Sequence, residues 1–416
     1  MPPTSVRDLD DDSVGFLLQA YVDLHTPNHW RGLYQEDLHD VCAALYGPGR
    51  CGDEDQNGED GDGDADAESR LWKYACQTLG LTTLPPSRTT WRGAYANLRS
   101  FLHFDGTVFQ WQCKEGHLAA VEARIAEVMD PFEAASAALG DVYDAFAGQA
   151  GADPDHVAAA ILGGGPVNVA ALVEALRAPS AALNAARLRV EGVLLRRDRG
   201  GTTALMWASW YGHVDVVRAL LLAFQRFYPE TPAHNRRDLM DAISVRDNDS
   251  TTALMQACER GHLEVVEAIL AVQPIAEAQD KRWENALMVA ARTGRADILK
   301  ALLGTESEFG PSWRQMLEKG NARRRTPLMI AVEAGNTEAV RVLLEAGANV
   351  DRAYPYSPNK LNTGKTALDW AGLSRYPIPP EIIELLVAYG ANTDTSTRAE
   401  TVRRAAEALG RPLLPL

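Results

Sequence analysis

The chain has 416 residues, of which 46% are hydrophobic and 23% are charged, and its formal net charge is −15. This length exceeds one ordinary core, so it predicts several domains or a repeat array of globular composition. Nine acidic residues and no basic ones lie in residues 52–68, which leaves about −6 for the rest of the chain and argues against a nucleic-acid-binding surface.

The compartment can be predicted from apolar runs and cysteines. The longest apolar runs are shorter than the roughly 18 residues of a membrane span. The first residues, MPPTSVRDLDDD, lack the basic and then apolar order of a signal peptide. The five scattered cysteines are typical of free thiols in a reducing compartment. We therefore expect a soluble intracellular protein without a membrane partner, in the cytoplasm, with the nucleus as an additional location.

Residues 1–103 are predicted to form a small helical module. Apolar residues at helical spacing indicate helices near residues 13–24 and 35–46, a third beginning at Arg70, and a fourth over residues 90–101. The acidic tract 52–68 is rich in Gly and Asp, which predicts a disordered loop between the second and third helices.

The end of this module has a distinctive order of residues. Leu71-Trp72-Lys73 is followed by Cys76, then by Gly80-Leu81, Pro85 and a predicted helix with Trp91 and Tyr95. This order resembles an F-box, a short helical module that docks on the Skp adaptor of cullin-based ubiquitin ligases. The usual Leu-Pro start is replaced by Leu9-Asp10, and two insertions separate the helices. The resemblance implies adaptor docking through Leu17, Leu18, Tyr21, Leu38, Val41, Leu71 and Trp72. The alternative is a helical cap for the segment that follows.

Residues 104–197 are predicted to be a helical bridge that begins with a degenerate repeat. The stretch TVFQWQCKEG runs from Thr107 to Gly116, and the same interval of nine residues recurs further along the chain. Within this stretch, Cys113 falls where Cys258 falls in its own repeat. An Ala-rich helical region follows.

Five copies of a helix–turn–helix unit follow. They begin with TALMWA, TALMQA, NALMVA, TPLMIA and TALDWA at Thr203, Thr252, Asn285, Thr326 and Thr366, spaced 49, 33, 41 and 40 residues apart. In the first four, a glycine follows nine residues later, at Gly212, Gly261, Gly294 and Gly335. The first residue can cap a helix, the Leu and Ala form a narrow buried stripe, and the glycine permits the turn. No unit can bury its stripe alone, so the copies must stack.

These residues resemble ankyrin repeats, whose pattern is D-x-x-G-x-T-P-L-H-x-A-A-x-x-G-H with a period of about 33 residues. The resemblance implies an all-α solenoid of five repeats over residues 198–394, closed by a capping helix in 395–416. The extra length is assigned to loops at residues 225–245, 305–319 and 353–359. Met or Asp replaces the histidine of the pattern, which should affect capping more than the fold.

In ankyrin proteins the turn tips and the exposed side of the first helix form a concave protein-binding surface. Transferred by position, the partner-binding residues are predicted to be Arg199, Trp210, Tyr211, Arg260, Lys281, Arg282, Arg292, Arg323, Arg325 and Lys365. Their neighbours on this surface are Thr202, Asn248, Asp249, Thr251, Glu259, Glu284, Glu333, Asn362 and Thr363. Trp210 and Tyr211 are either anchors or packing residues. Along two adjacent repeats, Lys281, Arg282, Arg323, Arg324 and Arg325 are either an ordinary solvated edge or a basic ridge for a partner that presents acidic residues.

Three other motifs have a plainer interpretation. Residues 53–64 mimic a calcium-binding EF-hand loop, but a solvated acidic loop is favoured. Residues 359–366, NKLNTGKT, end like a phosphate-binding loop, yet Gly364-Lys365-Thr366 is also the start of the fifth repeat. The spacing of His25, His29, His39 and Cys42 matches no standard zinc site. We expect no catalytic site, metal or cofactor.

Together these patterns predict a protein-binding protein and not an enzyme. The leading hypothesis is the substrate-recognition subunit of a Skp–cullin–F-box type ubiquitin ligase. The alternatives are an ankyrin scaffold or assembly factor with no ubiquitin role and, more remotely, a calcium-responsive regulator.

Overall fold

The structure is a computed structural model. It describes residues 83–85, 90, 94, 97–98, 101, 106–150, 169–228, 236–272, 278–304, 316–353, 364–373 and 377–412. All regular elements in these ranges are helices, which confirms the all-α prediction. The chain divides into two compact units, Met1–Ala120 and Val121–Leu416. The predicted acidic loop and all seven residues predicted to dock the adaptor lie outside the described ranges.

The first unit contains the helix predicted at the degenerate repeat. Helix α5 (Val108–Lys114) begins after Thr107, whose side chain accepts a hydrogen bond from the Gln110 backbone N–H. The Gln110 side chain in turn accepts a hydrogen bond from the Thr107 backbone N–H, so two unpaired donors are satisfied at the helix start. Trp111 of this helix is fully buried.

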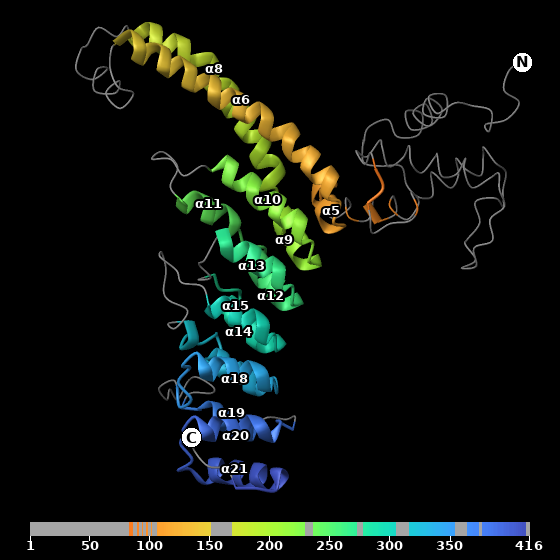
Figure 1. Ribbon diagram of the computed structural model, residues 1–416, viewed down its shortest axis with the longest axis vertical. Helices are drawn as coiled ribbons and strands as arrows, with labels where there is room; N and C mark the ends of the chain where they lie inside the picture. The colour runs from red at the N-terminus through yellow and green to blue at the C-terminus, as the bar shows by residue number, and fades with distance from the viewer. Residues whose placement is uncertain are drawn as a thin grey trace, which may run out of the picture. The chain divides into compact units, whose positions relative to one another are not determined.

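The other described helices begin with two long ones, α6 (Leu118–Ala150) and α8 (Val169–Leu194). The repeats follow in chain order (Figure 1), as α9 (Ala204–Tyr211), α10 (Val214–Phe227), α11 (Arg236–Ile243), α12 (Ala253–Arg260), α13 (Leu263–Val272), α14 (Ala286–Thr293), α15 (Ala296–Leu303), α17 (Pro327–Glu333), α18 (Thr337–Glu345), α19 (Ala367–Leu373), α20 (Pro380–Ala388) and α21 (Ser396–Leu409).

The repeats form two parallel layers. The first helices, α9, α12, α14, α17 and α19, each pack on the next in the series. The second helices, α10, α13, α15, α18 and α20, form the other layer in the same way, and α21 covers α19 and α20 at the end. Every repeat therefore buries its apolar stripe against its neighbours, as the stacking argument predicted.

The second helices supply much of the core. In α10, the side chains of Val217, Leu220 and Phe224 are at most 1% exposed. Burying a side chain of this kind is worth roughly 1.5–3 kcal/mol relative to leaving it in water. In α13, Val266 and Ile269 repeat the spacing of Val217 and Leu220, and both are fully buried, as is Val265.

The helix boundaries follow from the capping residues. The side chains of Thr203, Thr252, Asn285 and Thr326 each accept a hydrogen bond from the backbone N–H three residues later. The fifth repeat has a fuller capping box, because the Asp369 carboxylate also accepts from the Thr366 backbone N–H at 2.8 Å. In the first repeat Met206 offers only a sulfur acceptor, 3.5 Å from the Thr203 N–H. As predicted, Met changes the capping and not the fold.

Gly212 shows why the turn requires glycine. Its φ is +79°, and an added Cβ would lie 2.5 Å from the His262 ring nitrogen Nδ1. The Nε2 atom of that histidine lies 3.1 Å from the Trp210 carbonyl oxygen, so it ties the second repeat to the first.

The prediction that residues 225–245 form a loop is wrong. Helix α10 runs on to Phe227, and α11 occupies Arg236–Ile243. The extra helix is stable because Leu239 and Ile243 are buried beside α10. The α10 end also binds the bridge region, since Arg226 pairs with Glu133 of α6 at 2.8 Å.

Candidate functional site

The turns between repeats are held rigidly by aspartate side chains. In the second repeat, Asp247 Oδ1 accepts from the backbone N–H groups of Asp249, at 2.9 Å, and Thr251, at 2.8 Å. Asp280 makes the same pair of bonds in the third repeat. Such side-chain bonds stabilise tight turns. They place the polar tips of the repeats at reproducible positions.

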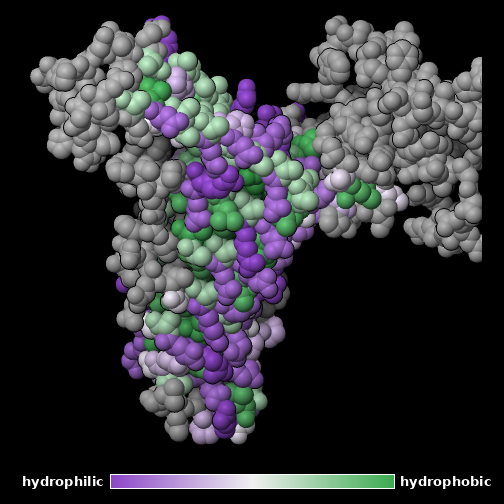
Figure 2. All heavy atoms as spheres, turned by 45° about the horizontal axis from the view of Figure 1, so that its top comes forward, coloured by the Kyte–Doolittle hydropathy of each residue, from purple (hydrophilic) through white to green (hydrophobic). Residues whose placement is uncertain are grey.

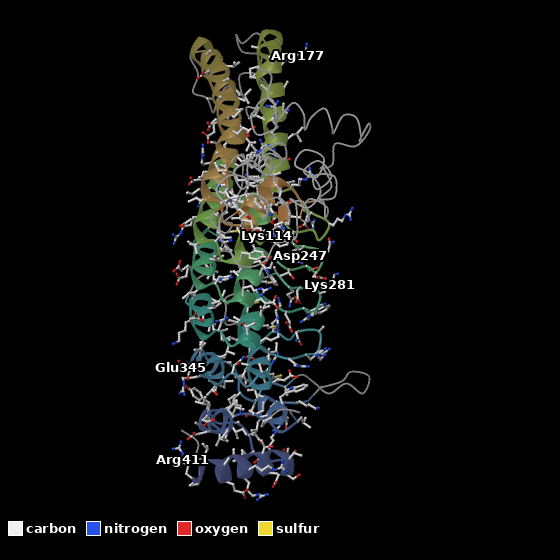
Figure 3. The ribbon with its side chains drawn as sticks, turned by 90° about the vertical axis from the view of Figure 1, so that its right-hand side faces the viewer. Lys114, Arg177, Asp247, Lys281, Glu345 and Arg411 are labelled. Atoms are coloured by element: carbon white, nitrogen blue, oxygen red, sulfur yellow. The ribbon has the colours of Figure 1, made fainter. Side chains whose placement is uncertain are left out.

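Neighbouring tips are also joined by backbone hydrogen bonds. The Lys281 N–H donates to the Asp249 carbonyl at 3.0 Å, and the Ala322 N–H donates to the Arg282 carbonyl at 2.8 Å. Figure 3 shows Asp247 and Lys281 on the same side of the stack, opposite Glu345. The tips therefore form one continuous edge along the second, third and fourth repeats.

A groove with a volume of about 700 Å³ lies between these tips and the first helices of the first three repeats. It is lined by Thr202, Trp207, Trp210, Tyr211, Asp247, Asp249, Thr251, Met255, Gln256, Glu259, Asp280, Lys281, Arg282, Val289 and Arg292. We call this the repeat groove. It has the size of a ligand-binding cleft and carries aromatic, acidic and basic side chains together.

The aromatic end of the groove is partly covered by the protein itself. The Arg260 guanidinium lies over the Trp210 ring, 3.6 Å from its centroid, in a cation–π contact. Tyr211 remains 45% exposed and stacks beside Trp207, with ring centroids 6.2 Å apart. Trp207 is fixed by the hydrogen bond from its Nε1 to Asp198 at 3.0 Å. Trp210 is therefore half-buried, with one face of its ring packed against Arg260, whereas Tyr211 presents its ring to solvent.

The charges in the groove largely compensate each other. Lys281 Nζ lies 3.1 Å from Asp249 Oδ1, and Arg292 lies 3.4 Å from both Glu259 and Glu284. The Glu284 side chain is 8% exposed, so its pairing with Arg292 is shielded from water more than the other two. Two cations of the predicted basic ridge are paired with the chain's own carboxylates, Lys281 with Asp249 and Arg325 with Glu333.

A second cluster surrounds Trp370, outside the groove. Arg325 and Lys365 lie over its ring at 4.6 and 5.3 Å from the centroid. Arg325 also pairs with Glu333. Burial lowers the pKa of Arg325, and nearby Arg323 lowers it further. The Gly364-Lys365-Thr366 stretch leads directly into α19, as the repeat interpretation requires.

The structure brings half of the ten predicted partner-binding residues into one groove. These are Trp210, Tyr211, Lys281, Arg282 and Arg292. Arg260 covers Trp210, whereas Arg199 and Arg323 are exposed at the first and fourth tips. Arg325 and Lys365 belong to the Trp370 cluster.

Sequence reasoning missed six groove residues, namely Trp207, Asp247, Met255, Gln256, Asp280 and Val289. Two signals could have found four of them. Asp247 and Asp280 occupy the first position of the D-x-x-G-x-T pattern, and the Trp207 and Gln256 side chains donate to the aspartate at that position in their own repeats. The spacing of nine residues between donor and acceptor is visible in the sequence.

Other chemistry finds little support in the described part of the chain. Cys113 and Cys258 are buried free thiols, and burial raises the pKa of both, which disfavours the reactive thiolate. The described residues contain no cluster of His, Cys, Asp or Glu suited to a metal ion. Within the same ranges, no helix has the length and apolar character to cross a membrane. The residues of the EF-hand-like and zinc-like motifs lie outside those ranges.

Comparison with known proteins identifies the repeats. The ankyrin-repeat profile for three copies matches residues 234–312 and 312–397, and the single ankyrin-repeat profile matches residues 200–224. The chain is also 34% identical over 80 residues to the E3 ubiquitin-protein ligase KEG of Arabidopsis thaliana. That match covers 19% of this chain and 4% of the plant protein. The ankyrin repeats indicate a protein-binding role, and such proteins are generally non-enzymatic interaction scaffolds.

Proposed function

We propose that this chain selects a target protein through the repeat groove and presents it to a Skp–cullin–F-box type ubiquitin ligase. The observation that carries the proposal is the groove itself, where the exposed Tyr211, two half-buried tryptophans and paired charges from three ankyrin repeats meet over about 700 Å³. A target segment lying in this groove would contact all three repeats at once.

The aromatic end of the groove supports target anchoring. Tyr and Trp are enriched among the residues that dominate the binding energy of protein interfaces. Tyr211 is 45% exposed, although the adjacent α9 residues Ala208 and Ser209 are fully buried. The Arg260 contact holds the Trp210 ring in one orientation, so little side-chain freedom is lost when a partner binds.

The ligase part of the proposal rests on sequence likeness. The F-box resemblance involves residues that lie outside the described ranges. The partial match to a plant protein named as an E3 ubiquitin-protein ligase points in the same direction. A module that docks on the adaptor, followed by a module that holds the target, would bring the target to the ligase.

The groove is tested with the target recovered by mass spectrometry of co-purified proteins. We expect Trp210→Ala and Tyr211→Ala each to weaken target binding by about 2 kcal/mol, as measured by calorimetry. Tyr389→Ala is the matched control, because Tyr389 is an aromatic 39% exposed that does not line the groove. Equal affinity of all three variants and the wild type would show that the groove does not hold the target.

The adaptor is tested by capture of purified Skp adaptor on the immobilised full chain. We expect capture by the wild type and by Trp210→Ala, and loss of capture in the double variant Leu71→Ala, Trp72→Ala. Circular dichroism should show that the double variant keeps its helical repeats. Failure of the wild type to capture the adaptor would end the ligase proposal.

A non-enzymatic scaffold or assembly factor is the second candidate. It is favoured by the extent of the similarity, because the likeness to a ligase covers only 4% of that protein. Target binding that depends on Trp210 and Tyr211, combined with no adaptor capture, is the outcome expected for this function.

A further inference from the structure

The tip of the third repeat carries an exposed tryptophan in an unusual backbone conformation. Trp283 has φ +62°, in the left-handed region that bulky side chains rarely adopt. At the same position the first and fifth repeats have Gly201 and Gly364, with φ +76° and +79°. Ser250 and Arg324 occupy this position in the second and fourth repeats.

Burial does not compensate for this conformation. The Trp283 side chain is 60% exposed, so most of its apolar surface remains in water. The turn itself is made by backbone bonds, including the Trp283 N–H to the Asp280 carbonyl at 2.9 Å, which glycine could also make. Strained residues of this kind concentrate at binding sites. The ring therefore contributes little to the repeat and is available to a partner.

Basic residues precede Trp283 in the chain and also lie on the neighbouring tip. Lys281 and Arg282 precede it, and the hydrogen bond from Ala322 to the Arg282 carbonyl brings the tip with Arg323 and Arg324 alongside. Lys281 is paired with Asp249. Arg282 and Arg323 are exposed, and neither forms an ion pair with any described residue. We call Lys281, Arg282, Trp283, Arg323 and Arg324 the tip patch.

The tip patch continues the repeat groove, because Lys281 and Arg282 also line the groove. The groove compensates its own charges, whereas the tip patch adds two arginines, Arg282 and Arg323, that pair with no carboxylate in the described part of the chain. A partner that lies in the groove and extends along the tips would thus contact a surface with charges of both signs first, and then a positively charged surface that contains Trp283. Charge complementarity at such a patch selects partners and accelerates their association.

We propose that the tip patch binds an acidic segment of the target protein, with Trp283 stacking on an apolar or aromatic residue between the acidic ones. Arg282 and Arg323 would supply charge-assisted hydrogen bonds to its carboxylates. This inference rests on the proposed function, since it assigns the chemistry of the target segment that continues beyond the groove.

The test uses the full chain and a fluorescein-labelled peptide of twelve residues in which Glu alternates with Leu. A matched peptide has Gln in place of Glu. In fluorescence anisotropy titrations we expect the Glu peptide to bind at least tenfold more tightly than the Gln peptide, with an affinity that falls as salt is added. Equal binding of the two peptides, or binding to neither, overturns the proposal.

Variants separate recognition from folding. We expect Trp283→Gly to reduce affinity for the Glu peptide at least fivefold while its melting temperature stays equal or rises, because glycine adopts the left-handed conformation freely. Arg282→Ala combined with Arg323→Ala should reduce the affinity and weaken its salt dependence. Ser250→Gly, at the equivalent position of the second repeat, should leave affinity unchanged. Unchanged affinity in the tip-patch variants contradicts the proposal.

The outcomes are distinct from those of the groove experiment. If the Glu peptide is not bound but Trp210→Ala still weakens binding of the target, only the tip-patch inference fails. A tightly bound single-stranded oligonucleotide that competes with the peptide would overturn the assignment to an acidic protein segment.

Discussion

At the scale of single residues, three repeat tips place a residue other than glycine in the left-handed backbone conformation. Ser250, Trp283 and Arg324 all have positive φ at a position where glycine is the residue without steric cost. For other residues the left-handed conformation costs roughly 1–2 kcal/mol. Each of these three tips therefore contains local strain that the surrounding hydrogen bonds of the turn must overcome.

Replacing Ser250 by glycine should stabilise the protein. We expect a gain of about 0.5–1 kcal/mol, because relief of the left-handed strain exceeds the greater unfolded-chain entropy of glycine. Urea unfolding followed by circular dichroism measures the change. A lower unfolding midpoint for Ser250→Gly would contradict the strain argument.

The reverse change at Gly201 is the matched comparison. Gly201→Ser should destabilise the protein by at least about 1–2 kcal/mol, since it introduces the same left-handed strain. Its Cβ would also lie 2.7 Å from Asn248 Oδ1 and 2.9 Å from the Asn248 backbone nitrogen. The two substitutions should thus have opposite signs in the same unfolding assay.

At the scale of elements, the last helix is held to the stack by an ion pair. Arg398 of α21 donates to both carboxylate oxygens of Asp369 in α19, at 2.7 and 2.6 Å. Their side chains are 13% and 15% exposed, so water screens this pair less than the surface pairs of α21. Because Asp369 also caps its own helix at Thr366, one carboxylate secures two elements.

Removing the Arg398 side chain should loosen α21. We expect Arg398→Ala to lower stability by about 2 kcal/mol, the usual range for hydrogen bonds to a charged group that is left partly buried. Arg403→Ala is the control, because its partners among the described residues are Glu400 and Glu407 on the exposed face of the same helix. A comparable loss of stability in both variants, measured by thermal unfolding, would show that the Asp369 contact stabilises the protein no more than a surface ion pair does.

The same ion pair should make stability depend on pH. Burial by itself raises the pKa of Asp369, but the hydrogen bonds from Arg398 and Thr366 outweigh it and hold the pKa below its usual value. The stabilisation is therefore complete above about pH 3.9, the pKa of an unfolded Asp, and is lost as the pH falls through the lower folded value. Asp369→Asn should reduce the slope of the unfolding free energy against pH over that interval, as measured by urea titrations between pH 5 and about 2. An unchanged slope contradicts this assignment.

At the scale of the repeat stack, stability is a sum of contacts between neighbours. Among the described repeats, each first helix packs mainly on the first helices before and after it and on the second helix of its own repeat, and α19 also packs on α21. Stacks of this kind unfold from their ends, because a terminal repeat lacks one neighbour. Figure 2 shows mainly hydrophilic side chains on the face of the stack that it presents, with apolar residues in separate patches.

Truncation after residue 394 should destabilise one end selectively. Loss of α21 exposes α19 and α20, so hydrogen exchange in these helices should accelerate strongly. Exchange in α9 and α12, which form the repeat groove, should change little, and target affinity should be retained. Equal acceleration in α9 and α19, measured by mass spectrometry, would mean that the stack unfolds as a single cooperative unit.

Much of the fold could be predicted because its signals are local. The caps at Thr203 and Thr252 and the left-handed turns at Gly212 and Gly261 lie within about ten residues of the helices they bound. The burial of Cys113 at the register of Cys258 also follows from one repeated pattern. Helix α11 escaped prediction because its stability depends on packing against α10.

The sequence alone determined the repeat, its register and the side of the stack that carries the candidate site, because ankyrin units are specified by interactions within and between adjacent copies. Only the tertiary structure decided the character of that site. It paired Lys281 with Asp249 and Arg260 with the Trp210 ring, across 32 and 50 residues of chain. Such contacts depend on the relative positions of neighbouring repeats. The order of charges along the chain therefore does not predict which cations have carboxylate partners.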